Sequence, residues 1–377
     1  MGSTAFMTLG AVLAGVAGVV IGAVLLRRRG PRTRGRQVIE ALTPLVAVGA
    51  VLALTLAVSL GRGVDSKFFA LAHIAYLGLV VSAPILGLGV LVAIVRHRLP
   101  TVAVVAAVAL LIPVPVGWYA THWAPYALRV SEARVVLAPA RAGHDPVRIG
   151  VLADLQTNHV GSYERRVVRT LQAQHPDLIV IPGDLFQGNE AQFRRVLPAY
   201  RALLRSLHAP HGVYAVQGDA ETADRLARLV AGTGVVVLND RVVSLRVGDR
   251  HVLLGGNKLR WAPPEGVAVR EELIDADPAA VRVLVAHRPE VVLGLPPNAG
   301  IDLVIAGHTH GGQVALPLFG PIVRFSPVSR PVAAGGLHEV DGNPIYVSTG
   351  AGLVRQQAPQ IRFLTRPSVG LITLDSP

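Results

Sequence analysis

The sequence contains no cysteine among its 377 residues. Disulfide bridges and thiolate metal sites are therefore excluded. Charge is also scarce, because 16% of the residues are charged while 51% are hydrophobic. That balance is too apolar for a soluble protein of this length, and it indicates membrane-spanning segments.

The few charges are distributed unevenly along the chain. Residues 1–144 hold 13 Lys and Arg against 3 Asp and Glu, a net of +10, whereas residues 145–377 hold 23 against 21. The basic surplus thus accompanies the apolar part of the chain. We interpret it as a membrane-topology signal, and we expect no nucleic-acid partner.

Four apolar runs in the first part of the chain are each long enough to cross a bilayer as a helix. They cover residues 7–26, 38–60, 68–95 and 101–118. Arginines follow the first run, whereas a signal peptide carries its charge before the apolar stretch, so we predict a retained span. Trp118 and Tyr119 end the fourth run like an interfacial aromatic belt. We predict a transmembrane region of about four helices over residues 1–126 and a connector over residues 127–146.

The loops between these runs predict how the chain crosses the membrane. The first loop carries six arginines, and the third contains Arg96 and Arg98. The positive-inside rule places both loops in the cytoplasm. We therefore expect a multi-pass protein of the cell membrane whose C-terminal domain lies on the extracytoplasmic side.

Residues 147–377 are expected to form a separate α/β domain, because short apolar runs alternate there with helical stretches. Strands are expected near residues 147–153, 178–182, 213–217, 235–238, 242–247, 251–255, 282–286, 301–306, 332–334, 345–348 and 370–374. Helices are expected near residues 163–174, 190–207 and 221–231. This order predicts two sheets flanked by helices.

Five of the expected strands end in polar side chains that are able to bind metal. These are Asp154 and Gln156, Asp184, Asp219 and Glu221, His287, and His308 and His310. One Asp after a strand is usually a helix cap or a turn residue. Five strand ends of this kind in one domain are hard to explain by capping, and the converging charges would repel one another unless cations lay between them. The pattern predicts a two-metal site.

The spacing of these residues resembles the five blocks of the calcineurin-like metallophosphoesterases, and in particular their membrane-anchored bacterial members. The blocks are Asp154-x-Gln156, Gly183-Asp184, Gly218-Asp219-x-Glu221, His287 and Gly307-His308-x-His310. The resemblance implies a four-layer α/β/β/α sandwich and a metal-activated hydroxide that attacks phosphorus. It implies that Asp154, His310 and Gln156 hold one divalent metal, that Asp219, His287 and His308 hold the other, and that Asp184 bridges both.

The sequence departs from the family pattern at three positions. Gln156 replaces a metal-binding His, and Asp219 replaces an Asn. Both changes favour oxygen donors, so we expect a preference for Mn²⁺, with Mg²⁺, Fe and Zn²⁺ as alternatives. Ala220 replaces the His that assists the leaving group, which leaves Glu221, His159 or water as the proton source.

Three functions are compatible with these features. The first is a membrane-anchored phosphohydrolase that acts on a phosphodiester or pyrophosphate, for which a lipid-linked substrate is sensible. The second is a regulatory protein that binds metal or phosphate with weakened catalysis, which Gln156 and Ala220 favour. A channel or transporter with a soluble appendage is the third and weakest, because the spans lack functional polar residues. Asn257 and Arg288 are further candidates for phosphate contacts, and the oligomeric state is open.

Overall fold

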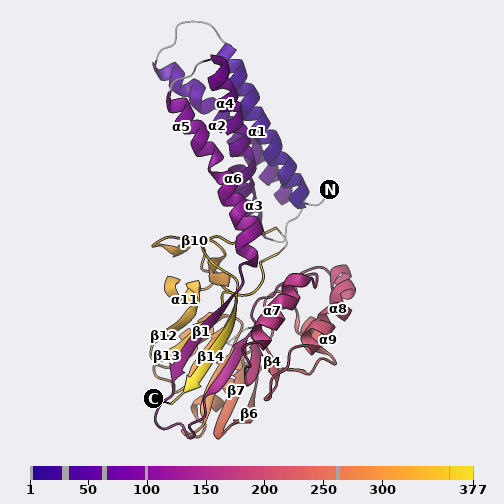
Figure 1. Ribbon diagram of the computed structural model, residues 1–377, viewed down its shortest axis with the longest axis vertical. Coiled ribbons are helices and arrows are strands. Elements are labelled where there is room, and N and C mark those ends of the chain that lie inside the picture. The colour runs from indigo at the N-terminus through magenta and orange to yellow at the C-terminus, as the bar shows by residue number, and fades with distance from the viewer. Residues whose placement is uncertain are drawn as a thin grey trace. The chain divides into compact units, whose positions relative to one another are not determined.

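The computed structural model describes residues 3–27, 34–61, 66–97, 101–259, 264–355 and 357–376 (Figure 1). The chain divides into two compact units, Met1–Thr121 with Arg355–Gln360, and His122–Val354 with Ile361–Pro377. The first unit is helical, and the second contains two six-stranded sheets. Three of the six arginines in the first loop, Arg28, Arg29 and Arg32, lie outside the described residues, as does Arg98 in the third loop, and the topology expected from these loops stays a prediction.

Within the described residues, four helices are long and apolar enough to cross a membrane, as the sequence predicts. They comprise α1 (Ser3–Arg27), α2 (Arg34–Gly61), α3 (Lys67–Leu77) continued by α4 (Ala83–His97), and α5 (Thr101–Leu111) continued by α6 (Pro113–Trp118). A π-helical turn, Gly78–Ser82, joins α3 to α4 directly before Pro84. The chain therefore accommodates the proline with one π-helical turn, and the helix continues through it.

Small residues allow α1 and α2 to pack closely. A Cβ atom on Gly10 would lie 2.4 Å from the Thr55 side chain, and one on Gly18 would lie 2.8 Å from Val48. Close backbone approach of this kind is typical of helices packed within a bilayer.

The first sheet of the α/β unit has the strand order β1-β14-β2-β3-β4-β5. Its strands are β1 (Arg129–Val136), β14 (Ser368–Asp375), β2 (Val147–Val151), β3 (Leu178–Ile181), β4 (Val213–Ala215) and β5 (Val235–Val237). The strands β2 to β5 run parallel, and β14 is antiparallel to β2. Helices α7 (Ser162–Gln172), α8 (Glu190–Arg205) and α9 (Ala223–Val230) cover one face of this sheet, with Leu171, Phe193 and Leu226 in the core.

The second sheet has the order β12-β13-β9-β8-β7-β6. Its strands are β12 (Gly336–Val340), β13 (Asn343–Val347), β9 (Leu303–Ala306), β8 (Val281–Val285), β7 (Arg250–Gly256) and β6 (Arg241–Val247). Helices α10 (Pro264–Ile274) and α11 (Arg330–Ala334) pack on its outer face, and a short hairpin joins β10 (Ala315–Leu316) to β11 (Gly320–Pro321). Alternate residues such as Ile149, Val283 and Ile305 fill the space between the sheets. The four-layer α/β/β/α sandwich is therefore confirmed.

Several segments differ from the expectations, and α10, β10 and β11 are among those that were not expected. The expected connector over residues 127–146 contains β1, whose eight residues pair in parallel with β14 at the edge of the first sheet. Val332–Ala334, expected as a strand, belongs to α11, because Ser329 and Pro331 begin a helix there. β12 was not expected, because its exposed edge position supplies a weak apolar pattern.

Candidate metal centre

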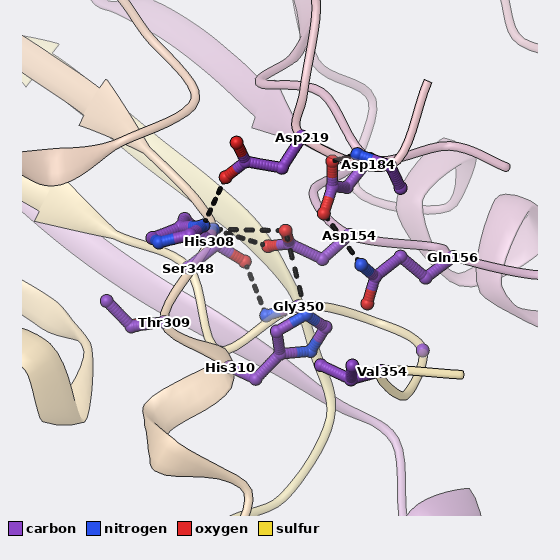
Figure 2. Close-up of polar contacts among 12 residues, drawn as sticks. Asp154, Gln156, Asp184, Asp219, His308, Thr309, His310, Ser348, Gly350 and Val354 are labelled. Carbon is purple, nitrogen blue, oxygen red and sulfur yellow. Dashed lines mark hydrogen bonds and ion pairs between the residues drawn. The ribbon is translucent and has the colours of Figure 1, made fainter. Parts of the chain in front are cut away.

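All five predicted strand ends meet at one edge of the sandwich. Asp154, Asp184 and Asp219 follow β2, β3 and β4 of the first sheet, while His287 and His308 follow β8 and β9 of the second. The strands are parallel within each set, so their carboxyl ends lie together, as in other open α/β folds. Figure 2 shows the side chains of Asp154, Asp184, Asp219 and His308 pointing toward one another.

One group of possible metal ligands consists of Asp219, His287 and His308. His308 Nδ1 lies 2.9 Å from Asp219 Oδ2, and His287 Nε2 lies 3.4 Å from the same oxygen. The two imidazole nitrogens are 3.2 Å apart. Asp184 Oδ1 lies 3.5 Å from His287 Nε2, so its carboxylate adjoins this group.

The second group consists of Asp154, Asp184 and His287. His310 Nε2 lies 3.8 Å from Asp154 Oδ1, which adds another imidazole on the far side of that carboxylate. Gln156 donates a 2.7 Å hydrogen bond from Nε2 to Asp184 Oδ2. Asp184 thus stands between the two groups, where the resemblance expects the bridging ligand.

Hydrogen bonds to the backbone fix which nitrogen each imidazole presents. His287 Nδ1 lies 2.8 Å from the Pro182 carbonyl oxygen, and His308 Nε2 lies 2.8 Å from that of Phe325. Each of these nitrogens must carry hydrogen to donate to a carbonyl. Once a ring has lost its second proton, the opposite nitrogen, which faces the carboxylates, carries the lone pair that a metal-binding histidine requires.

The backbone at the site adopts a conformation that side chains disfavour. Asp154, Gln156, Asp184, His308 and His310 have φ angles of 49°, 35°, 54°, 70° and 50°. Such left-handed residues are uncommon outside glycine and gather at functional sites. Glycines make the crowding possible, because a Cβ on Gly307 would lie 2.5 Å from the Asp154 carboxylate and one on Gly218 would lie 2.2 Å from Asp184.

Burial and mutual attraction shift the pKa values of the site. Burial raises the pKa of Asp154 to about 7. Although burial opposes charge on His287, the carboxylates of Asp184, Asp219 and Asp154 raise its pKa to about 10. Burial also acts against the Asp219 carboxylate, but hydrogen bonds from His287, His308 and Arg288 hold its pKa well below the usual range.

His310 provides the clearest test of whether divalent cations fit these residues. Its ring is buried, and neither nitrogen makes a hydrogen bond to the part of the chain that the structure describes. Burial lowers its pKa well below the usual value, so the ring is neutral. A buried polar group without a partner is costly, and a cation beside Asp154 would satisfy it. The donor set of carboxylates and neutral imidazoles suits divalent metals.

The two predicted proton donors occupy different surroundings. Glu221 is buried, and its carboxylate accepts hydrogen bonds from the backbone of Gly218 and Phe186 at 3.3 and 3.4 Å. Burial raises its pKa to about 8, so it carries a proton at neutral pH. His159 is exposed and lies beside Thr157 and Glu164, outside both ligand groups.

Two arginines near the site have contacts that the sequence does not predict. Arg288 forms a two-point hydrogen-bonded ion pair with Asp219. Arg362 is fully buried, and its guanidinium donates to the carbonyl oxygens of His310, Thr349, Gly350 and Gly352. Asn257 donates to Gly266 in the core, which does not support a phosphate contact. The sequence offers one signal for the Arg288–Asp219 pair, which is that Arg288 directly follows the predicted ligand His287.

The fold and the site define a metal-dependent phosphoester hydrolase. Residues 147–312 match the family model of the calcineurin-like phosphoesterases, which confirms the resemblance seen in the sequence.

Several known proteins are similar to this chain. It is 28% identical to the uncharacterized metallophosphoesterase YkuE of Bacillus subtilis over 68% of this chain and 89% of that protein. It is 23% identical to the UDP-2,3-diacylglucosamine pyrophosphatase LpxG of Chlamydia trachomatis over 72% of this chain and 97% of that protein. Among solved structures, Haemophilus influenzae NAD nucleotidase matches with a TM-score of 0.39 and 12% identity over 56% of this chain and 51% of that one.

Proposed function

We propose that the protein is a membrane-anchored phosphohydrolase that cleaves a phosphodiester or pyrophosphate bond. The observation that carries the proposal is the convergence of Asp154, Asp184, Asp219, His287 and His308 within two overlapping ligand groups. In the proposed division of the chain, residues 1–126 form the membrane anchor and residues 147–377 the catalytic domain, to which β1 also belongs.

The site residues would hold two divalent cations. Asp154, His310 and Gln156 would bind one, Asp219, His287 and His308 the other, and Asp184 both. Cations bound there supply a nucleophile from water near neutral pH and neutralise charge on the phosphoryl oxygens. The left-handed backbone and the hydrogen bonds that fix the imidazole tautomers would keep these side chains in position to hold the cations. Gln156 and Asp219 favour oxygen coordination, so Mn²⁺ is the expected metal, and a clear preference for Zn²⁺ would count against it.

The leaving group is proposed to need little protonation. The methyl side chain of Ala220 cannot protonate a leaving group. The Ala220 backbone N–H donates a 2.7 Å hydrogen bond to Asp184 Oδ1. Glu221 carries a proton but is buried against backbone, and His159 is exposed. A phosphate leaves more readily than an alkoxide, so a pyrophosphate or an activated diester is the expected substrate class.

A lipid-linked substrate and an extracytoplasmic active site complete the proposal. Four apolar helices support anchoring, and the similarity to LpxG, named as a pyrophosphatase of UDP-2,3-diacylglucosamine, supports a lipid-linked pyrophosphate. The basic first and third loops support an external domain. Because the chain has no cysteine, Asp275→Cys in whole cells would test the side: labelling by a membrane-impermeant maleimide is expected, and protection until lysis would contradict it.

The alternative is a regulatory protein that binds metal or phosphate without useful turnover, which the Gln156 and Ala220 departures favour. The full chain in detergent, stripped of metal and supplied with Mn²⁺, separates the two. We expect hydrolysis of bis(p-nitrophenyl) phosphate that Asp184→Asn abolishes. Metal binding without hydrolysis of any phosphodiester or pyrophosphate tested would favour the regulatory function.

A further inference from the structure

An exposed apolar hairpin follows the metal centre directly. The hairpin, residues 315–322, contains β10 and β11 and begins three residues after Gly312. Leu318 at its tip is fully exposed, and three other large apolar side chains are 44–52% exposed: Leu316, Phe319 and Ile322. Single exposed apolar residues are ordinary, but four on one eight-residue hairpin form a surface that water solvates poorly.

The hairpin is fastened to the site at its base. Gln313 is buried and accepts a 2.7 Å hydrogen bond from the Val354 backbone, and Ala315 donates a 2.9 Å bond to the Phe363 carbonyl. Exposed Leu364 adjoins the same base. These hydrogen bonds hold the base of the hairpin in place, while its apolar tip projects into solvent.

Leucine is an unfavourable residue for the turn at the tip of the hairpin. Leu318 has a φ angle of 63°, in the left-handed region where glycine or asparagine is favoured. A leucine there is strained and also fully exposed, so neither the turn nor the core explains it. A contact made by the side chain outside the domain would explain it.

Basic side chains flank the apolar tip. The Arg330 guanidinium lies 4.0 Å from the centre of the Phe319 ring, and Arg324 is exposed. Apolar side chains flanked by arginines are typical of segments that lie at a lipid interface, where the rings enter the acyl region and the cations meet phosphate headgroups.

The strand register relates this edge to the point where the chain enters the domain from the last apolar helix. Arg129, the first residue of β1, pairs with Ser368, and Gly370 two residues later pairs with Val151, just before Asp154. The Tyr126 ring packs edge-on against the Tyr163 ring, with 5.2 Å between the ring centres, and the Tyr163 hydroxyl donates to the Ala351 carbonyl oxygen beside the site. The chain therefore enters the domain at the edge that carries the metal centre, and in Figure 1 β10 lies beyond that end of the sheets.

We infer that the hairpin of residues 315–322 dips into the acyl layer of the membrane to which the chain is anchored, and so places the metal centre at the lipid headgroups. The inference rests on the membrane anchoring in the proposed function. The occupant is the bilayer itself, since the fourth candidate span, Thr101–Tyr126, is separated from β1 by Ala127 and Leu128 alone, and the chain enters the domain at the edge that carries the metal centre.

Fluorescent labelling tests the contact without reference to catalysis. Leu318→Cys in the cysteine-free chain, labelled with an environment-sensitive NBD dye, is placed in nanodiscs with or without lipids that carry a shallow nitroxide. Asp275→Cys is the matched control, because it is exposed before β8, at the opposite edge from the site. We expect blue-shifted emission and nitroxide quenching at position 318 and neither at 275. Equal, water-like emission at both positions would overturn the inference, as would a blue shift at 318 without lipid quenching, which would indicate a protein partner.

A second measurement relates the hairpin to substrate. Leu318→Ser with Phe319→Ser should lower the ratio of kcat/KM for a diacyl pyrophosphate in nanodiscs to kcat/KM for a soluble diester by about tenfold or more. Val236→Ser, an exposed apolar residue of β5, is the control. An unchanged ratio would overturn the coupling to substrate. Absence of all hydrolysis would instead contradict the proposed function, while the labelling result would still decide the membrane contact.

Discussion

Arg288 holds Asp219 in a two-point ion pair, with Nε 3.0 Å from Oδ2 and Nη2 2.6 Å from Oδ1. Asp219 stands where the related blocks carry Asn, so the chain has one negative charge more than the family pattern at this position. The Arg288 guanidinium neutralises this extra charge, and the two hydrogen bonds to Asp219 hold the guanidinium in position. Such fork-to-carboxylate pairs are directional, so Lys is not equivalent.

Removing Arg288 is therefore expected to affect the site through Asp219. Arg288→Ala should reduce kcat/KM by about tenfold, and Asp219→Asn should reduce it as well, but the double variant should lose less than the two combined. The stability change should stay near 1 kcal/mol or below, because Arg288 is partly exposed. Strictly additive effects on kcat/KM would show that the pair does not act as a unit.

Metal binding should release protons from the site. In the metal-free protein His287 has a pKa raised to about 10, so at pH 8 its ring is charged and must lose a proton before it binds a cation. Calorimetry in buffers of different ionisation enthalpy should detect about one proton released per chain at pH 8 and none well above pH 10. Release that does not change with pH over this range would contradict the assignment of His287 as a ligand.

The same shift predicts how stability of the metal-free protein depends on pH. A raised pKa means that charged His287 stabilises the folded state fully below its unfolded value of about 6.5. That contribution is lost as the pH rises through about 10. His287→Gln should flatten the decline in unfolding free energy across this window, as measured by urea denaturation with chelator present.

Arg362 should be required for the His310 side of the site. Its buried guanidinium satisfies four carbonyl oxygens, including that of His310. Arg362→Met leaves these groups unpaired and should cost at least about 3 kcal/mol of unfolding free energy, with weaker metal binding in whatever folds. Arg366→Met is the matched control, because Arg366 is exposed and donates to Ala127 and Leu128 at the surface. Equal effects of the two substitutions would argue against the role of Arg362.

Restoring a histidine at position 220 should broaden the substrate range. General acid assistance contributes about 10²- to 10⁴-fold, and it matters most for poor leaving groups. Ala220→His should therefore raise turnover of alkyl monoesters by about tenfold or more relative to pyrophosphates. Ala220→Gln, of similar size but unable to titrate, should not. An equal rise in relative monoester turnover for both variants would show that side-chain size, and not proton transfer, causes the effect.

The sequence was sufficient to predict which residues gather, because buried parallel strands are apolar along their whole length and their ends are marked by polar residues such as Asp184 and His287. It could not predict β1 or β12, since edge strands are half exposed and their patterns resemble loops.

The contacts that complete the site were also beyond sequence reasoning. The Arg288–Asp219 pair joins residues 69 positions apart, and Arg362 reaches carbonyl oxygens that any residue would supply. The left-handed backbone at Asp154, Asp184 and His310 arises from packing of the loops against one another, which local propensity opposes.

The central claim is that one bridging carboxylate joins two metal sites, and metal content measured beside activity tests it most directly. The full chain loaded with Mn²⁺ and freed of excess metal should contain about two ions per chain, as the two-metal site requires. Asp184→Asn should retain one or fewer and lose hydrolysis of bis(p-nitrophenyl) phosphate. Two tightly held ions in the Asp184→Asn variant, or an active wild-type chain with no divalent metal, would contradict the account.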